Sequence, residues 1–179
     1  MDKTLYEKLR QPFDIRFISW KINNYNADRT RAMITFHVDA RAVQHRLNEV
    51  LGVDGWSFTF TELEKVNAVH GRLTIYFYNE TDGKVTNEDC IINSVTREDV
   101  GYPANDERPE WYKAAVSDAL KRCAVHFGVA LFLYALPPLW IDLNSPGQRY
   151  LTKEQDDICR NFLQENLAKM SSKSTVKNK

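Results

Sequence analysis

Apolar and polar residues alternate along some stretches of the chain and recur at helical spacing along others. Alternation predicts strands at residues 13–21, 31–38, 56–63, 71–79 and 84–95. Apolar spacings of three and four predict helices, which we place at residues 4–11, 40–51, about 110–133 and 151–168. The polar stretches 22–29 and 96–109 predict loops. This order of helices and neighbouring strands indicates an α+β fold with an antiparallel sheet.

Capping and turn residues mark several of these boundaries. Thr4 and Thr152 each begin a capping box, and Asp39 stands where the N-cap of the 40–51 helix is expected. Asp82-Gly83 is a strong hairpin turn between the last two strands. Gly128 is expected to bend or end the long helix. The predicted buried faces are one stripe on each of the two later helices: Trp111, Ala115, Ala119, Cys123 and Phe127, then Ile158, Phe162 and Leu163.

The length of 179 residues suits one domain with a tail. We expect a domain at residues 1–150, a C-terminal helix at 151–168 and a disordered basic tail at 169–179. The longest apolar run, Val129–Leu136, is far shorter than the ~20 residues that a membrane span needs. The N-terminus also lacks an apolar signal core, so we expect a cytoplasmic protein without a membrane partner.

The charges cancel overall but are unevenly distributed. The chain has 24 basic and 24 acidic residues, a balance that weighs against a nucleic-acid binder. Residues 51–110 hold 12 of the acidic residues and only 5 of the basic ones. The segments on either side are therefore mildly basic, which permits a positively charged face.

No pattern of catalytic or cofactor-binding residues is present. The chain has neither a glycine-rich phosphate loop nor an H-E-x-x-H sequence, and its three cysteines lack zinc spacing. We therefore expect no metal, no cofactor, no catalytic residue and no enzyme activity. The acidic pairs Glu88-Asp89, Glu98-Asp99 and Asp106-Glu107 leave a metal-dependent nuclease as an alternative.

The long predicted helix offers a short cationic ridge opposite its apolar stripe. Lys113, Ser117 and Lys121 are spaced by four, and Arg122 follows Lys121 directly. Asp118 lies four residues before Arg122 and could pair with it. Such a ridge suits the phosphates of a nucleic acid, but an amphipathic helix with solvated lysines gives the same pattern.

The same helix resembles the signature of the Rad-fifty-two/twenty-two annealing family, including its bacterial branch, the DNA-damage-response A proteins. The resemblance is collinear over about residues 5–140 and includes a D-A-L-K-R run followed by F-G. The matching segments are Leu9–Phe13, Val38–Gln44, Gly71–Thr74, Val95–Gly101, Asp118–Arg122, Phe127-Gly128 and Tyr134–Pro137.

This resemblance implies a curved antiparallel sheet packed on the long helix, in protomers that form a homo-oligomeric ring. It further implies a protein that binds single-stranded DNA and either anneals it without ATP or protects 3′ ends, in recombination and double-strand break repair. Other recombination or single-strand-binding proteins would be further partners. An adaptor with the same fold that binds proteins rather than DNA is the alternative.

The resemblance also suggests which residues contact DNA. The family's groove cations fall on Lys121, Arg122 and, in the early hairpin, Lys21, while a further cation position holds His126, which is mostly neutral at pH 7. We add three weaker cation candidates and two aromatic residues that either stack on bases or pack in the core: Lys113, Arg41 and Arg31, then Tyr25 and Trp20.

Overall fold

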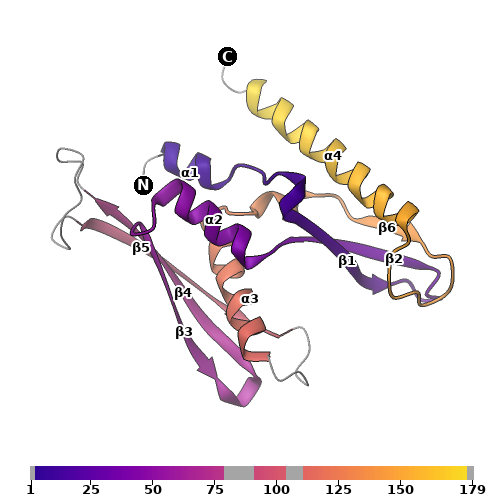
Figure 1. Cartoon of the computed structure of the whole chain (residues 1–179), viewed down its shortest axis with the longest axis horizontal. Coiled ribbons are helices and arrows are strands. Elements are labelled where there is room, and N and C mark those ends of the chain that lie inside the picture. The colour runs from indigo at the N-terminus through magenta and orange to yellow at the C-terminus, as the bar shows by residue number, and fades with distance from the viewer. Residues whose placement is uncertain (1–2, 79–90, 104–110, 177–179) are drawn as a thin grey trace. The chain divides into compact units, whose positions relative to one another are not determined.

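A computed structural model describes residues 3–78, 91–103 and 111–176 (Figure 1). The chain forms two compact units, each assembled from two separate segments. Unit 1 comprises residues 1–11 and 40–131, and unit 2 comprises residues 12–39 and 132–179. Each unit contains a three-stranded antiparallel sheet and at least one helix packed on it. The predicted α+β class is confirmed, with the strands divided between two sheets.

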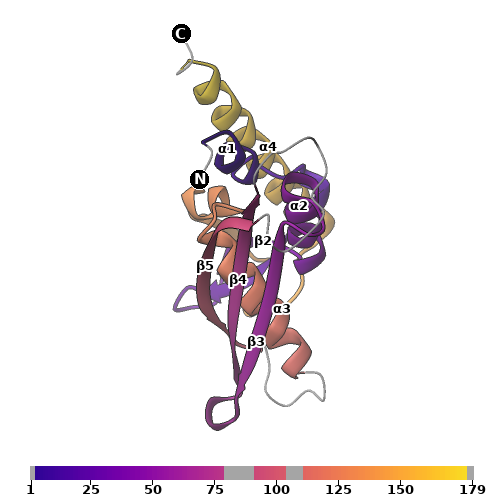
Figure 2. The same ribbon diagram turned by 90° about the vertical axis from the view of Figure 1, so that its left-hand side faces the viewer.

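Unit 1 is built on a sheet in which β4 lies between β3 and β5, as Figure 2 shows. The helix α3 runs along one face of this sheet, and α1 packs on α2. The elements of unit 1 are α1 (Lys3–Leu9), α2 (Ala40–Leu51), β3 (Trp56–Leu63), η2 (Glu64–Val66), β4 (Ala68–Tyr78), β5 (Ile91–Gly101) and α3 (Trp111–Val125).

The predicted bounds of α2 and β3 are confirmed, and Gly52 follows α2 with a positive φ of 80°. The prediction of a loop from residue 96 is wrong, because β5 continues to Gly101. Its charged residues remain in the strand because they pair across to β4, where Arg72 and His70 both contact Glu98. The turn predicted at Asp82-Gly83 lies outside the described residues.

The helix α3 is shorter than the 110–133 that its periodicity predicts. It ends at Val125, and the next turn contains Gly128 at φ 91° and Ala130 at φ 60°. Amides of this turn bond to carbonyls three residues back, as in the bond that the Gly128 amide donates to Val125. Left-handed backbone cannot continue an α-helix, which explains the earlier end. The predicted buried stripe is confirmed from Ala115 to Phe127.

Unit 2 has a sheet of order β1-β2-β6, with α4 packed over one face. Ile34 and Ile141 of the sheet pack with Cys159 of α4 in its buried core. The elements are η1 (Ile15–Phe17), β1 (Ile18–Tyr25), β2 (Arg31–Val38), β6 (Leu139–Asp142) and α4 (Lys153–Val176), with η4 (Leu131–Ala135) leading into β6.

The first strand of unit 2 lies further along the chain than predicted. Asp14 accepts a hydrogen bond from the Arg16 amide, which caps the short helix η1, so β1 begins only at Ile18. The strand then continues through a bulge between Ile22 and Asn24, in residues where we predict a loop. The bulge lets this polar segment stay paired with β2.

The helix α4 starts as predicted, since Thr152 and Gln155 exchange hydrogen bonds in a capping box. Its buried face differs from the prediction: Ile158 is 50% exposed, and Cys159 is buried in its place. The helix also runs to Val176, past the tail boundary predicted at residue 169. Throughout 3–78, 91–103 and 111–176, no helix is both long enough and apolar enough to cross a membrane.

Candidate nucleic-acid interface

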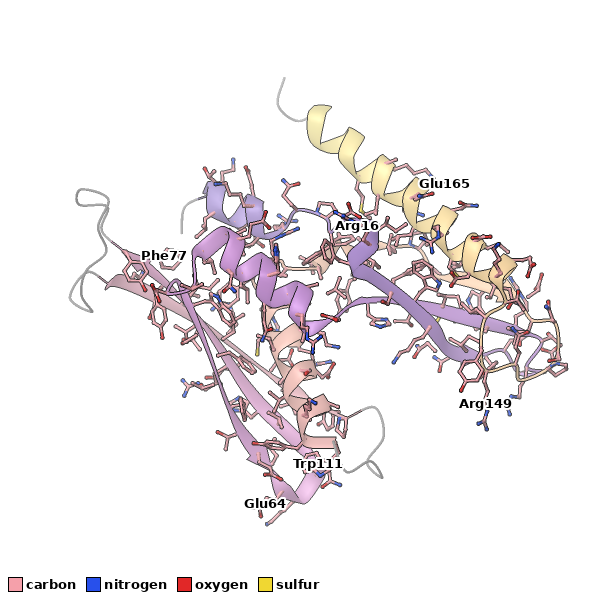
Figure 3. The ribbon with its side chains drawn as sticks, in the orientation of Figure 1. Arg16, Glu64, Phe77, Trp111, Arg149 and Glu165 are labelled. Carbon is pink, nitrogen blue, oxygen red and sulfur yellow. The ribbon has the colours of Figure 1, made fainter. Side chains whose placement is uncertain are left out.

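The helix α3 lies unusually near its sheet because small residues face each other across the contact. A Cβ atom at Gly101 would overlap the backbone of Ala115 and Ala119, and one at Gly71 would lie 2.9 Å from the Ala119 Cβ. At the start of α3, Trp111 (Figure 3) packs against the buried cluster that includes Ala115 and Ala119. The close contact brings the charged side chains of α3 within reach of those on β5.

Asp99 of β5 joins the two basic residues at the end of α3. The Arg122 Nε donates to one Asp99 oxygen at 2.9 Å, and the His126 Nε2 lies 3.0 Å from the other. Partial burial acts to raise the pKa of Asp99, but hydrogen bonds from Arg122, the Val100 amide and His126 outweigh it and hold that pKa below its ordinary value. Arg122 is therefore held by an ionised carboxylate.

Lys121 has a carboxylate partner of its own. Its Nζ lies 3.5 Å from Asp118 one turn earlier, while the other Asp118 oxygen accepts from the Tyr102 amide. The i,i+4 spacing predicts an Asp118–Arg122 pair, but Arg122 reaches across to Asp99 instead. The formal charges of Lys121, Arg122, Asp118 and Asp99 cancel. We call these four residues and His126 the α3 cluster.

The α3 cluster is only partly shielded from solvent. The exposed fraction of the side chain is 31% for Lys121, 47% for Arg122 and 48% for His126. The remaining candidate cations of unit 1, Lys113 at the start of α3 and Arg41 at the start of α2, are also exposed. Lys113 lies about 12 Å before Lys121 along the helix, at 1.5 Å per residue.

Lys21 and Arg31 lie in unit 2, on the strands β1 and β2. Lys21 is exposed, and it makes no ion pair with any residue in the part of the chain that the structure describes. The Arg31 Nε lies 3.1 Å from Asp142 of β6. The structure thus places the candidate cations in two groups, one in each unit.

The two aromatic candidates of unit 2 are both engaged. The indole Nε1 of Trp20 donates to Asp156 of α4 at 2.7 Å, and the Arg160 guanidinium lies 5.4 Å from the ring centre. Trp20 also packs against the core under α4, as the core alternative predicts. Tyr25 donates from its hydroxyl to the Gln148 carbonyl, with Arg29 over its ring at 4.9 Å. Both side chains stabilise the unit.

Sequence reasoning missed two residues that matter here. Asp99 was not predicted as a partner of Arg122, because no local pattern shows that the two lie side by side in the fold. Trp140 is 36% exposed on β6 and lies outside every predicted strand, because residues 139–142 are few and do not alternate between apolar and polar. The signal that could have found β6 is the short apolar run that follows Pro137-Pro138.

The described residues form neither a metal-binding site nor a reactive thiol site. No group of three His, Cys, Asp or Glu side chains there is arranged to hold a metal ion. Cys123 and Cys159 are buried free thiols, and burial raises the pKa of each to about 11. Such thiols are poor nucleophiles at neutral pH.

Comparison with known proteins identifies the family of this chain. Residues 2–148 match the family described as Rad52/22 family double-strand break repair protein. The chain is 44% identical over 142 residues to the single-stranded DNA-binding protein DdrA of Deinococcus radiodurans, covering 76% of this chain and 57% of that protein. It is 38% identical over 144 residues to DdrA of Deinococcus deserti, covering 77% of this chain and 60% of that protein.

The chain thus spans somewhat less than two thirds of the length of these two relatives. The match with the family covers α3 and both sheets, and ends before α4. On the strength of this coverage and of the identity with the two relatives, the chain belongs to the Rad52/22 family of double-strand break repair proteins.

Proposed function

We propose that this protein binds single-stranded DNA and anneals complementary strands, or protects 3′ ends, without ATP, in recombination and double-strand break repair. The observation that carries the proposal is the position of Lys121 and Arg122, adjacent on α3 and partly open to solvent. The two DdrA relatives carry the name of single-stranded DNA-binding proteins, which supports the same substrate.

The α3 cluster explains how a protein of zero net charge could hold DNA. A phosphate offers the same anionic oxygens as Asp99 or Asp118, so it can replace either carboxylate on the cations. The exchange is favoured when counterions leave the DNA. Each exchange adds little to the binding free energy, because the cation loses its carboxylate partner when it gains the phosphate.

Repetition would compensate for this weak individual contact. We propose that protomers assemble into a ring, so that one strand meets the same cations in copy after copy. Each phosphate neutralised on single-stranded DNA adds about 0.7 to the slope of log affinity against log salt. A strand held along its backbone leaves its bases free to pair, which favours annealing.

The direct test is the double variant Lys121→Ala with Arg122→Ala, compared with Lys65→Ala. Lys65 is an exposed lysine of the same unit, in η2. Binding to a fluorescent single-stranded oligonucleotide is measured over a salt series. We expect the double variant to lose at least about tenfold in affinity at low salt and to show a shallower salt slope, with Lys65→Ala unchanged. Equal affinity in the folded double variant would contradict this assignment of the site.

Annealing and end protection are separated by two further assays on the wild-type protein. Fluorescence transfer between complementary labelled oligonucleotides, without ATP, follows annealing. Digestion by a 3′ exonuclease follows end protection. If the protein accelerates pairing of the two oligonucleotides, the annealing role is supported. If it slows digestion without accelerating pairing, end protection is supported.

The neutral α3 cluster favours one alternative, an adaptor that keeps the fold but binds a protein. The ion pair of Arg122 with Asp99 would then stabilise the fold and would not be replaced by a phosphate. Gel filtration with and without an oligonucleotide distinguishes the two functions. A large oligomer that does not bind the oligonucleotide at low salt would favour the adaptor.

A further inference from the structure

We propose that Trp140 of β6 stacks on a nucleobase of single-stranded DNA, with Lys21 of β1 holding a phosphate on the same face of the sheet. This inference rests on the proposed DNA binding and names a contact for it. It assigns a DNA contact to unit 2, whereas the α3 cluster belongs to unit 1.

The strand register places Lys21 and Trp140 on one face. Residues paired across an antiparallel sheet share a face, and every second residue of a strand does so as well. Lys21 pairs with Thr35, and Met33, two residues from Thr35, pairs with Trp140. Ile34 of the same strand points the other way, into the core under α4. Lys21 and Trp140 therefore lie on the sheet face that α4 leaves uncovered (Figure 1).

The spacing of the two residues suits a nucleotide strand. Their Cα atoms are separated by two strand spacings of about 4.8 Å and by two residues along the strand, roughly 12 Å in all. A lysine side chain is long and mobile, so its ammonium group can cover part of that distance. An extended strand crossing the sheet would then meet a positive charge and, beyond it, an aromatic surface.

The Trp140 side chain is exposed and makes no polar or ring contact with the described residues. It is 36% exposed, with no hydrogen bond and no aromatic or cation contact to any residue in the described ranges. Trp20 of the same unit, by contrast, is bonded to Asp156 under α4. An exposed aromatic ring beside a cation is the combination with which proteins hold single-stranded nucleic acid.

Charge favours an anionic occupant such as DNA at this face. Unit 2 contains 11 basic and 8 acidic residues, a net charge of +3, whereas unit 1 contains 13 and 16, a net charge of −3. The one carboxylate that the register adds to this face near Trp140, that of Asp142, is paired with Arg31. Lys21 thus remains available to a phosphate.

Two exposed aromatic residues of unit 1, one on β3 and one at the start of α3, are weaker candidates. Phe60 and Tyr112 contact each other with ring centres 6.1 Å apart, and Tyr112 also meets Trp111. Their rings are already engaged with one another. The Trp140 ring has no such neighbour in the described structure.

The test compares two oligonucleotides of equal length, one with normal bases and one whose sugars carry no bases. Three variants are measured: Trp140→Ala, Trp140→Phe and the control Tyr150→Ala. Tyr150 is 84% exposed in the same unit but lies in the loop before α4. We expect Trp140→Ala to bind the normal oligonucleotide roughly 5- to 100-fold more weakly and the base-free one as the wild type does. Trp140→Phe should keep part of the affinity, and Tyr150→Ala should keep all of it.

Tryptophan fluorescence gives a second readout that does not depend on affinity. A base stacked on Trp140 quenches its emission, so the quenching seen when DNA saturates the wild type should diminish in Trp140→Phe. If folded Trp140→Ala keeps the wild-type preference for bases, the inference is wrong while DNA binding stands. If it changes only the oligomer size in gel filtration, Trp140 is a contact between copies of the chain. If the wild type binds neither oligonucleotide at low salt, the proposed function itself fails.

Discussion

The two units attach a helix to a three-stranded sheet in opposite ways. In unit 1, the backbones of α3 and its sheet approach closely where Gly71 and Gly101 face Ala115 and Ala119. In unit 2, α4 meets the sheet through aromatic side chains, with Phe162 stacked on Phe36 at 5.6 Å between ring centres. We call the close contact of α3 with its sheet the thin interface, and the contact of α4 through aromatic rings the thick interface.

This difference determines whether the charged side chains of each unit can pair with one another. A thin interface brings Arg122 and His126 of α3 against Asp99 of β5, so the charged groups pair within the fold. In unit 2 the acidic start of α4 lies over one sheet face, and Lys21 projects from the other. Arg122 of unit 1 is therefore paired within its unit, whereas Lys21 of unit 2 is exposed.

The largest expected effect comes from thickening the thin interface. Gly101→Val should cost roughly 3 kcal/mol of unfolding free energy or more, because its side chain would overlap the backbone of α3. Gly52→Ala is the control, since its Cβ meets nothing within 4 Å and only the positive φ adds a cost of about 1 kcal/mol. Urea unfolding followed by circular dichroism measures both. Equal losses would show that α3 does not need its close approach.

The thick interface should respond to loss of its polar anchor. Trp20→Phe keeps an aromatic ring under α4 but removes the donor to Asp156, at an expected cost of about 1–2 kcal/mol. Trp56→Phe is the matched control, because the indole of Trp56 donates to Asn48 at an exposed position. Its loss should be smaller in the same urea experiment, and the reverse order would contradict the anchoring role.

Asp99→Asn removes the carboxylate that pairs with Arg122, so Arg122 should come closer to the exposed state of Lys21 in unit 2. The folded protein holds the Asp99 pKa below its ordinary value near 3.9, so ionised Asp99 stabilises the fold above that pH. This contribution is lost as the pH falls through the lowered pKa. The variant should lack that acid-dependent loss and be less stable at neutral pH by under about 1 kcal/mol, since Arg122 is half exposed.

Asp99→Asn should also release Arg122 for DNA. We expect the salt slope of oligonucleotide binding to become steeper by about 0.7 for each added phosphate contact. Asp157→Asn, a change at an exposed acid of α4, serves as the control for one lost negative charge. A steeper slope in both variants would indicate a general charge effect rather than release of Arg122.

The smallest effect on stability is expected at Lys21. Lys21→Ala should change the unfolding free energy by less than about 0.5 kcal/mol, because the side chain is exposed. It should nevertheless lower the salt slope of single-strand binding by about 0.7 per phosphate contact. A loss of stability without a change in slope would place Lys21 in the fold rather than in the interface.

Elements with strong local signals could be predicted from the sequence. The bounds of β2, α2 and β3 follow from alternation and capping residues such as Asp39, which act within a few positions. The strand β5 could not be predicted at its charged end, because Glu98 stays in the strand through partners on β4. Such partners lie more than twenty residues away in sequence.

The candidate site shows the same division. Local sequence identified Lys121 and Arg122, but the partner of Arg122 comes from a strand 23 residues earlier. The prediction of a buried Ile158 was wrong because packing, and not spacing alone, sets the direction in which α4 faces its sheet. The charged residues could be identified from the sequence, but the ion pairs that they form could not.

The two buried thiols give each unit its own reporter of opening. Cys123 lies beneath α3, where its Sγ donates to the Gly71 carbonyl, and Cys159 lies beneath α4. An alkylating reagent reaches either sulfur only when that helix lifts from its sheet, so mass spectrometry of a timed labelling reaction would report two opening rates from one sample. Adding an oligonucleotide during the reaction would then reveal which helix the bound strand holds in place.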